Sequence, residues 1–319
     1  MEQVRLNREF ILKYMNVICL VAVVLGFYAF NRNFLSAFNI RNILTDTAPL
    51  LLVSSALTFV LLLGCIDLST GSVISCACVI TGLYIGTTGS AAMIGLMLLM
   101  GLVAGLLNGL VYTLLRVPTF VATLCTSAIW SCAALVISGG APKGIPIKQW
   151  KVINWSKITV LGVPIMFVIA IAVLLLLWFV QSRTPVGKTI FAVGANEKAA
   201  RMMGLRTTWA KLVAFTLTGI GASVAGAFYA IKLRSSLPAV GSGLTLMAIA
   251  SVVLGGTTLT GGIGSVPRTL IGVLLVICLQ NGLNVIAVDA FWQEIVFGFL
   301  VIVAIILNSD KSGRDIIIK

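Results

Sequence analysis

An acidic residue inside an apolar run is the first candidate for chemistry in this sequence. Asp67 lies in LLLGCIDLSTGS and is surrounded by small and hydroxyl-bearing residues, namely Gly64, Ser69, Gly71 and Ser72. A charged side chain at the centre of a bilayer costs roughly 3 kcal/mol on insertion scales, so such an acid needs partners or a function. Glycines allow a helix to break there, and the freed backbone and hydroxyl groups can hydrogen-bond the carboxylate. We therefore expect a broken helix near residues 64–72.

A second stretch has the same character. LGGTTLTGG at 254–262 matches LGCIDLSTG at 63–71 in two leucines and two glycines, with Thr260 in the place of Ser69. Paired broken segments of this kind point to a transport path, so we expect a second broken helix near 255–264. Hydroxyl and amide groups at such breaks suit an uncharged polyol better than an ion. The groups expected along the path are those of Asp67, Ser69, Ser72, Asn108, Thr257 and Thr258.

The groups that enzymes use for catalysis are missing from the sequence. It has no histidine, and its nine acidic residues are scattered, mostly in loops or near the ends of apolar runs. The seven cysteines show none of the spacings that hold zinc or form a redox dithiol. We expect neither an enzyme nor a metal or cofactor site.

The elements that must position these residues are membrane spans. Of the 319 residues, 59% are hydrophobic and 10% are charged. One crossing takes roughly 20 apolar residues, so the chain can hold about ten spans, and each should be helical. Gly101, Gly105 and Gly109 recur every four residues, which predicts close packing between helices. The sequence predicts one all-α polytopic domain over residues 1–319, with spans near 14–31, 47–64, 70–87, 91–115, 119–138, 162–181, 209–231, 244–261, 267–286 and 290–308.

The net charge of +13 sets the expected orientation. Basic residues lie between apolar runs and form no face interleaved with stacking aromatics, which argues against nucleic-acid binding. With both termini on one side, that side holds 14 of the 22 Lys and Arg residues and the other side holds 8. Because cytoplasmic loops carry the excess of positive residues, we assign both termini and the 182–210 loop to the cytoplasm.

Four stretches stand in order along the chain and carry a family resemblance. The first holds Gly64, Asp67, Leu68, Ser69, Gly71 and Ser72. The second holds Gly101, Gly105, Asn108, Gly109, Val117, Pro118, Phe120, Thr123 and Leu124. The third holds Arg183, Thr184, Gly187, Ala192, Gly194, Asn196, Ala199, Ala200 and Gly204, and the fourth is IASVVLGGTTLTGGIGSV. Together they resemble the permease subunits of bacterial ABC importers of the ribose and monosaccharide type, relatives of branched-chain amino acid permeases.

The resemblance implies a role for the polar stretch GANEKAARMMGL at 194–205. In such importers the loop after the sixth span docks on a separate ATP-binding subunit. Asn196 is suited to cap a short helix there, and Gly204 to end it. The residues implied in docking are Gly194, Asn196, Ala199, Ala200, Gly204 and Leu205. A solvated loop that follows the positive-inside rule is the alternative.

The function implied is that of a permease subunit of an ATP-driven importer for a small neutral solute, with a monosaccharide as the implied class. Its expected partners are two ATP-binding subunits, a second permease chain, alike or different, and an extracytoplasmic solute-binding protein. The expected location is the bacterial inner membrane. The translocation path would include Gly64, Asp67, Ser69, Gly71, Ser72, Asn108, Phe120, Thr123, Thr257 and Thr258.

One alternative uses the same acid differently. In a secondary transporter driven by protons or sodium, Asp67 would be the coupling site. The sequence also departs from the family pattern, because Cys65 stands for a usual second glycine, and Thr245 and Met247 stand where many members carry acids. These departures leave the solute open.

Overall fold

The computed structural model describes residues 2–289, 291–293, 295–299 and 302. Within them the fold is almost entirely helical. The main helices are α1 (Glu2–Phe30), α2 (Ala37–Leu62), α3 (Thr70–Thr88), α4 (Ser90–Leu114), α5 (Thr119–Ser138), α7 (Ile165–Arg183), α8 (Pro185–Ala195), α9 (Glu197–Met202), α10 (Thr207–Leu233), α11 (Leu244–Leu254) and α12 (Val266–Val285). The all-α polytopic prediction is confirmed.

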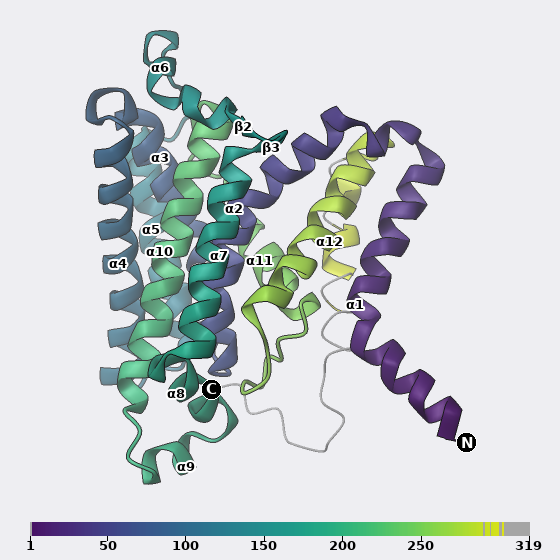
Figure 1. Cartoon of the computed structure of the whole chain (residues 1–319). Helices are drawn as coiled ribbons and strands as arrows, with labels where there is room; N and C mark the ends of the chain where they lie inside the picture. Colours follow the sequence, from purple (N-terminus) through teal and green to yellow (C-terminus); the bar gives the residue numbers. More distant parts are fainter. Residues whose placement is uncertain (1, 290, 294, 300–301, 303–319) are drawn as a thin grey trace.

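Short elements cap one end of the bundle. They are α6 (Trp150–Ile153) and the two-residue strands β1 (Lys143–Gly144), β2 (Thr159–Val160), β3 (Val163–Pro164) and β4 (Ser235–Ser236). Strand β1 pairs antiparallel with β4, and β2 with β3. Figure 1 shows α6, β2 and β3 at one end, whereas α8, α9 and the start of α1 lie at the other. The 143–157 and 182–210 segments are therefore at opposite ends, as the charge distribution predicts.

Seven helices of the described chain are long and apolar enough to cross a membrane: α2, α3, α4, α5, α7, α10 and α12. The stretch Met15–Phe30 of α1 and the helix α11 are apolar but shorter. The expected span at 244–261 is wrong in its extent, because α11 ends at Leu254 and Gly256 leaves the helical conformation with a φ of 91°. The expected span at 290–308 lies mostly outside the described residues, so the count of ten is not confirmed.

Helix α2 is the central element. In its most apolar window 83% of the residues are buried, against 28% for α4 and 22% for α5. Figure 1 shows α2, α3, α4, α5, α7 and α10 side by side, with α1, α11 and α12 forming a second group beside α2. Helix α2 thus lies between the two groups of helices, and the first break follows its C-terminal end at Leu62.

Helices α4 and α10 pack backbone to backbone, as the glycine spacing predicts. A Cβ added at Gly101 would lie 2.6 Å from the carbonyl oxygen of Gly219, and one at Gly105 would lie 2.5 Å from Cα of Thr216. The Ser223 hydroxyl also donates a hydrogen bond to the carbonyl oxygen of Met97. Small residues let these helices approach closely, where lipid supplies no hydrophobic drive for association.

A single methyl group tests this packing. We expect Gly105→Ala to destabilise the protein by about 1–3 kcal/mol, because the methyl group overpacks the α4–α10 contact. Gly95→Ala is the matched control, since a Cβ at that position of α4 meets no atom within 4 Å. Thermal unfolding of the purified protein in detergent measures both. Equal melting temperatures for the two variants would contradict the packing described here.

Candidate functional site

The first break separates α2 from α3. Helix α2 ends at Leu62, Gly64 takes a positive φ of 72°, and helical structure resumes at Thr70. The Asp67 side chain within this break is buried, with 1% of its surface exposed. One of its carboxylate oxygens accepts hydrogen bonds from the backbone N–H of Ser69 at 2.9 Å and from the Ser69 hydroxyl at 2.7 Å. The expected broken helix is confirmed, and Asp67 holds its turn.

Helix α4 completes the surroundings of Asp67 through Asn108. The Asn108 amide nitrogen donates to the Ser69 hydroxyl at 2.7 Å and lies 3.5 Å from the Asp67 carboxylate. Its amide oxygen accepts from the Thr126 hydroxyl of α5 at 2.6 Å. In the part of the chain that the structure describes, every hydrogen-bond partner of Asp67 is neutral. Buried polar groups satisfied in this way stabilise a single local geometry.

Helix α5 holds the backbone of the same break. The backbone N–H of Leu68 donates to the Thr123 hydroxyl at 3.1 Å, and that of Ile66 to the Thr119 hydroxyl at 3.4 Å. Non-helical backbone at membrane depth is tolerated only where protein groups or a cavity satisfy it. Thr119 and Thr123 supply those groups, so α5 fixes the path of the chain between α2 and α3.

The second break touches the first. It runs from Gly255 to Ser265, between α11 and α12, and the N–H of Gly262 donates to the carbonyl oxygen of Leu62 at 2.8 Å. Gly64 packs against the backbone of Thr260, since a Cβ added to Gly64 would lie 2.8 Å from that carbonyl oxygen. The match between the two sequence stretches therefore corresponds to two breaks in direct contact.

Thr257 and Thr258, which were expected along the path, lie in the second break. The Thr258 hydroxyl lies 3.3 Å from the carbonyl oxygen of Gly261, and its backbone N–H donates to the carbonyl oxygen of Ile263 at 3.0 Å. Thr257 is fully buried. Within the described residues, no hydrogen bond joins either threonine to Asp67, Ser69 or Asn108, so the structure does not unite all the expected path residues in one network.

A cavity of about 410 Å³ lies between α3, α5 and the segment that joins β4 to α11. We call it the hydroxyl cavity. Six hydroxyl-bearing side chains and no charged one belong to its wall, which is formed by Leu68, Gly71, Ser72, Ser75, Ser127, Ser131, Leu135, Pro238, Ala239, Gly241, Ser242 and Thr245. Ser72 and Ser127 are joined across the cavity wall, with 2.7 Å between their hydroxyl oxygens. Ser127 is midway along α5, so the cavity is at mid-depth of that span.

An irregular segment forms one side of the hydroxyl cavity. Between β4 and α11 the chain passes close to α3, where the N–H of Gly241 donates to the Ser75 hydroxyl at 2.9 Å. The Thr245 hydroxyl accepts from the N–H of Gly71 at 2.9 Å. Irregular backbone at the depth of a span is expected where it lines a cavity, so this segment marks the hydroxyl cavity as a built feature of the fold.

The expected path residues thus lie in several separate places. Asp67, Ser69, Asn108 and Thr123 form one buried network, whereas Gly71 and Ser72 line the hydroxyl cavity beside it. Gly64 belongs to the contact between the breaks, Thr257 and Thr258 lie in the second break, and Phe120 is 43% exposed on α5. Four cavity residues were not singled out from the sequence, namely Ser75, Ser127, Ser131 and Ser242, and Thr245 was noted only as a departure from the family pattern.

The 182–210 segment is folded into the helices α8 and α9. The Thr184 hydroxyl accepts from the N–H of Gly187 at the start of α8, and the Asn196 side chain accepts from the N–H of Ala199 at the start of α9, at 3.3 and 3.1 Å. Gly204 follows α9 with a φ of 77°. The predictions that Asn196 caps a short helix and that Gly204 ends it are confirmed.

The outward surface of this segment differs from the expected one. Ala200 is buried, and Gly194 packs on the carbonyl oxygen of Leu62, so their small size serves packing inside the chain. Leu205 is half-buried. The large apolar side chains that face outward were not singled out from the sequence, and they are Met202 (83% exposed), Met203 (69%) and Trp209 (58%).

Residues 39–305 match the family described as branched-chain amino acid transport system / permease component. The chain belongs to this family. The ribose import permease protein RbsC of Bacillus subtilis is 34% identical over 284 residues, which cover 89% of this chain and 88% of that protein. No solved structure matches the chain.

Two further permeases from Escherichia coli K12 are similar to this family member. Its ribose import permease protein RbsC is 31% identical over 96% of each chain. The D-allose transport system permease protein AlsC is 32% identical over 86% of this chain and 84% of that protein. The resemblance drawn from the four stretches is confirmed. The alternative of an ion-coupled secondary transporter is not supported, because these relatives are permease proteins of ribose import and of a D-allose transport system.

The neutral surroundings of Asp67 lead to a prediction about substitutions. Asp67→Leu leaves the backbone N–H and the hydroxyl of Ser69 without their acceptor, at about 1–3 kcal/mol for each unsatisfied group. Asp67→Asn keeps one acceptor oxygen, so we expect a smaller loss of melting temperature in detergent and partial retention of uptake. Asp289→Leu is the control, because the Asp289 carboxylate accepts from the N–H of Phe291 in the same way but at an exposed site. Near-normal melting of Asp67→Leu would contradict the network.

Proposed function

We propose that this chain is the membrane-spanning permease subunit of an ATP-driven importer of the ABC type, and that its solute is a monosaccharide. The observation that carries the solute class is the hydroxyl cavity, which has six hydroxyl side chains and no charge in its wall. Hydroxyl groups both donate and accept hydrogen bonds, so they match a polyol. A volume of about 410 Å³ also falls within the range of small-molecule sites.

The translocation path proposed here runs from the hydroxyl cavity past the Asp67 break. Ser72 lines the cavity, and three residues earlier Ser69 belongs to the buried Asp67 network. Transport requires that a site binds its solute well enough to admit it and weakly enough to release it. Scattered hydroxyls without a charged anchor meet both conditions. In this scheme Asp67 holds the break and takes no part in moving an ion.

The partner at the α8–α9 end is proposed to be an ATP-binding subunit. Met202, Met203 and Trp209 are exposed there beside the basic side chains of Lys198 and Arg201. Methionine, tryptophan and arginine are enriched at protein interfaces. Two ATP-binding subunits would serve two permease chains, alike or different, and ATP-driven closure would favour one arrangement of the permease pair over the other.

The same scheme assigns the two ends of the molecule. The excess of basic residues supports a cytoplasmic location for α8, α9 and both termini of a protein in the bacterial inner membrane. The end with α6 and the short strands would then receive the solute-binding protein. No cofactor is required by the permease itself, because ATP is hydrolysed on the partner chain.

Transport measurements test the function. With an ATP-binding subunit and a solute-binding protein in proteoliposomes, we expect labelled ribose or allose uptake to need ATP and to ignore a protonophore. Ser127→Ala with Ser131→Ala should raise the solute concentration for half-maximal uptake about 5- to 30-fold, since one or two hydrogen bonds are lost and each contributes about 1 kcal/mol. Thr45→Ala is the control, because that hydroxyl bonds the carbonyl oxygen of Arg41 in its own helix. Uptake that follows an imposed ion gradient without ATP would overturn the proposal.

Labelling in intact cells tests the orientation. In a background with the seven native cysteines replaced, we expect Lys148→Cys to react with a membrane-impermeant thiol reagent. Lys198→Cys should react only after the cells are opened, because it lies at the end assigned to the cytoplasm. Reaction of the variant at position 198 from outside the cell would reverse the assignment.

A further inference from the structure

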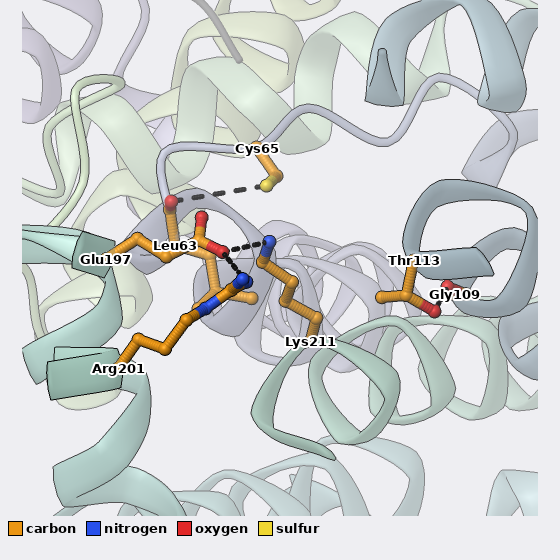
Figure 2. A network of polar contacts seen from close by, with 7 residues as sticks. All are labelled: Leu63, Cys65, Gly109, Thr113, Glu197, Arg201 and Lys211. Atoms are coloured by element: carbon orange, nitrogen blue, oxygen red, sulfur yellow. Dashed lines mark hydrogen bonds and ion pairs between the residues drawn. The ribbon is translucent and has the colours of Figure 1, made fainter. Parts of the chain in front are cut away.

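The docking segment contains one acidic side chain, and that side chain points inward. Residues 182–210 include five Lys and Arg residues and a single carboxylate, that of Glu197. A Glu197 carboxylate oxygen lies 2.7 Å from Nζ of Lys211 at the start of α10, and 3.2 Å from a guanidinium nitrogen of Arg201 in α9 (Figure 2). The Lys211 and Glu197 side chains are 11% and 19% exposed, whereas Arg201 is 69% exposed. Water screens the inner pair less than the outer one.

Lys211 also contacts α4 and, through it, the first break. Its Nζ lies 4.5 Å from the centroid of the Tyr112 ring, a cation–π geometry. Tyr112 packs on Phe215 with ring centroids 6.0 Å apart, and its side chain lies close to that of Cys65. Cys65 is buried in the break, two residues before Asp67. A continuous set of contacts therefore joins α9 to the break.

Helix α9 stands away from the rest of the bundle. Figure 1 shows it below α8 and α10 at the end of the molecule. Three surface hollows of about 740, 550 and 490 Å³ adjoin it, and Arg201 belongs to the wall of each. Ala200 is the buried side chain of α9. The ion pair between Glu197 and Lys211 therefore helps to hold α9 against α10.

We propose that Lys211 is a positioning residue for transport. Held between the Glu197 carboxylate and the Tyr112 ring, it ties the docking helix α9 to the break that carries Asp67. A displacement of α9 by the ATP-binding subunit is passed through Lys211 and Tyr112 to the loop at Cys65. This inference rests on the proposed docking of α9, and it adds the route by which that docking acts on the path.

The test measures sugar uptake and ATP hydrolysis in the same proteoliposomes, with the ATP-binding subunit, the solute-binding protein and labelled ribose or allose. We expect Lys211→Met to keep ATP hydrolysis but to lower the sugar taken up per ATP about 2- to 30-fold, the range of coupling effects seen on substitution along such contacts. Lys211→Arg keeps the charge and the contact with the ring, so it should retain most of the wild-type ratio. Glu197→Gln should resemble Lys211→Met.

A matched ion pair at the opposite end is the control. Lys232 Nζ lies 2.5 Å from the Asp46 carboxylate, with side-chain exposures of 26% and 36%. Lys232→Met removes the same kind of charge but lies far from α9, so it should leave the sugar taken up per ATP unchanged. A general effect of losing a salt bridge would lower the ratio in both lysine variants, and that outcome would overturn the inference.

Two further variants keep the inference testable if Lys211→Met fails to assemble. Tyr112→Leu removes both the ring and the hydroxyl and should lower the ratio, whereas Tyr112→Phe keeps the ring below Lys211 and should lower it less. Wild-type ratios in both Glu197→Gln and Tyr112→Leu would overturn the inference while ATP-dependent uptake stands. Wild-type uptake without ATP would instead overturn the proposed function, and the inference with it.

Discussion

Non-helical backbone at the depth of a membrane span must find hydrogen-bond partners inside the protein. The break between α2 and α3 meets this requirement with side chains from two other helices. Thr119 and Thr123 of α5 accept from its backbone, and Asn108 of α4 joins Ser69 and Asp67. The positions of α4 and α5 are therefore tied to the break. Helix α3 begins directly after the break, and the hydroxyl cavity lies between α3 and α5.

The second consequence of the breaks is their contact with each other and with the docking segment. The carbonyl oxygen of Leu62 accepts from Gly262, and Gly194 of α8 packs on that same carbonyl group. Any side chain at position 194 would collide there, so the glycine is required by close approach. Helix α8 thus meets both breaks at one point, close to the Cys65 end of the Asp67 loop.

The sequence predicted the long spans, the two breaks and the start and end of α9, because each depends on local pattern. Asparagine is a preferred residue at the start of a helix, so Asn196 is enough to predict that a helix begins there. The extent of α11 was missed, because the uncharged glycines and threonines after Leu254 do not interrupt a hydropathy pattern, which does not register the turn at Gly256. Ser127 was missed for a different reason. A serine in an apolar helix is ordinary, and its relation to Ser72 appears only when α3 and α5 lie side by side.

The placement of charge decides which energy source the fold can use. A carboxylate that exchanges a proton or sodium ion must exist in two states with different partners, yet Asp67 is buried among fixed neutral donors that favour its role as a hydrogen-bond acceptor. Glu197, the one carboxylate of residues 182–210, is instead paired with Lys211 at the surface where we propose that a partner binds. Work done on this protein is therefore expected to enter through α9 as a mechanical displacement, and the uncharged hydroxyl cavity has only to let a neutral solute pass.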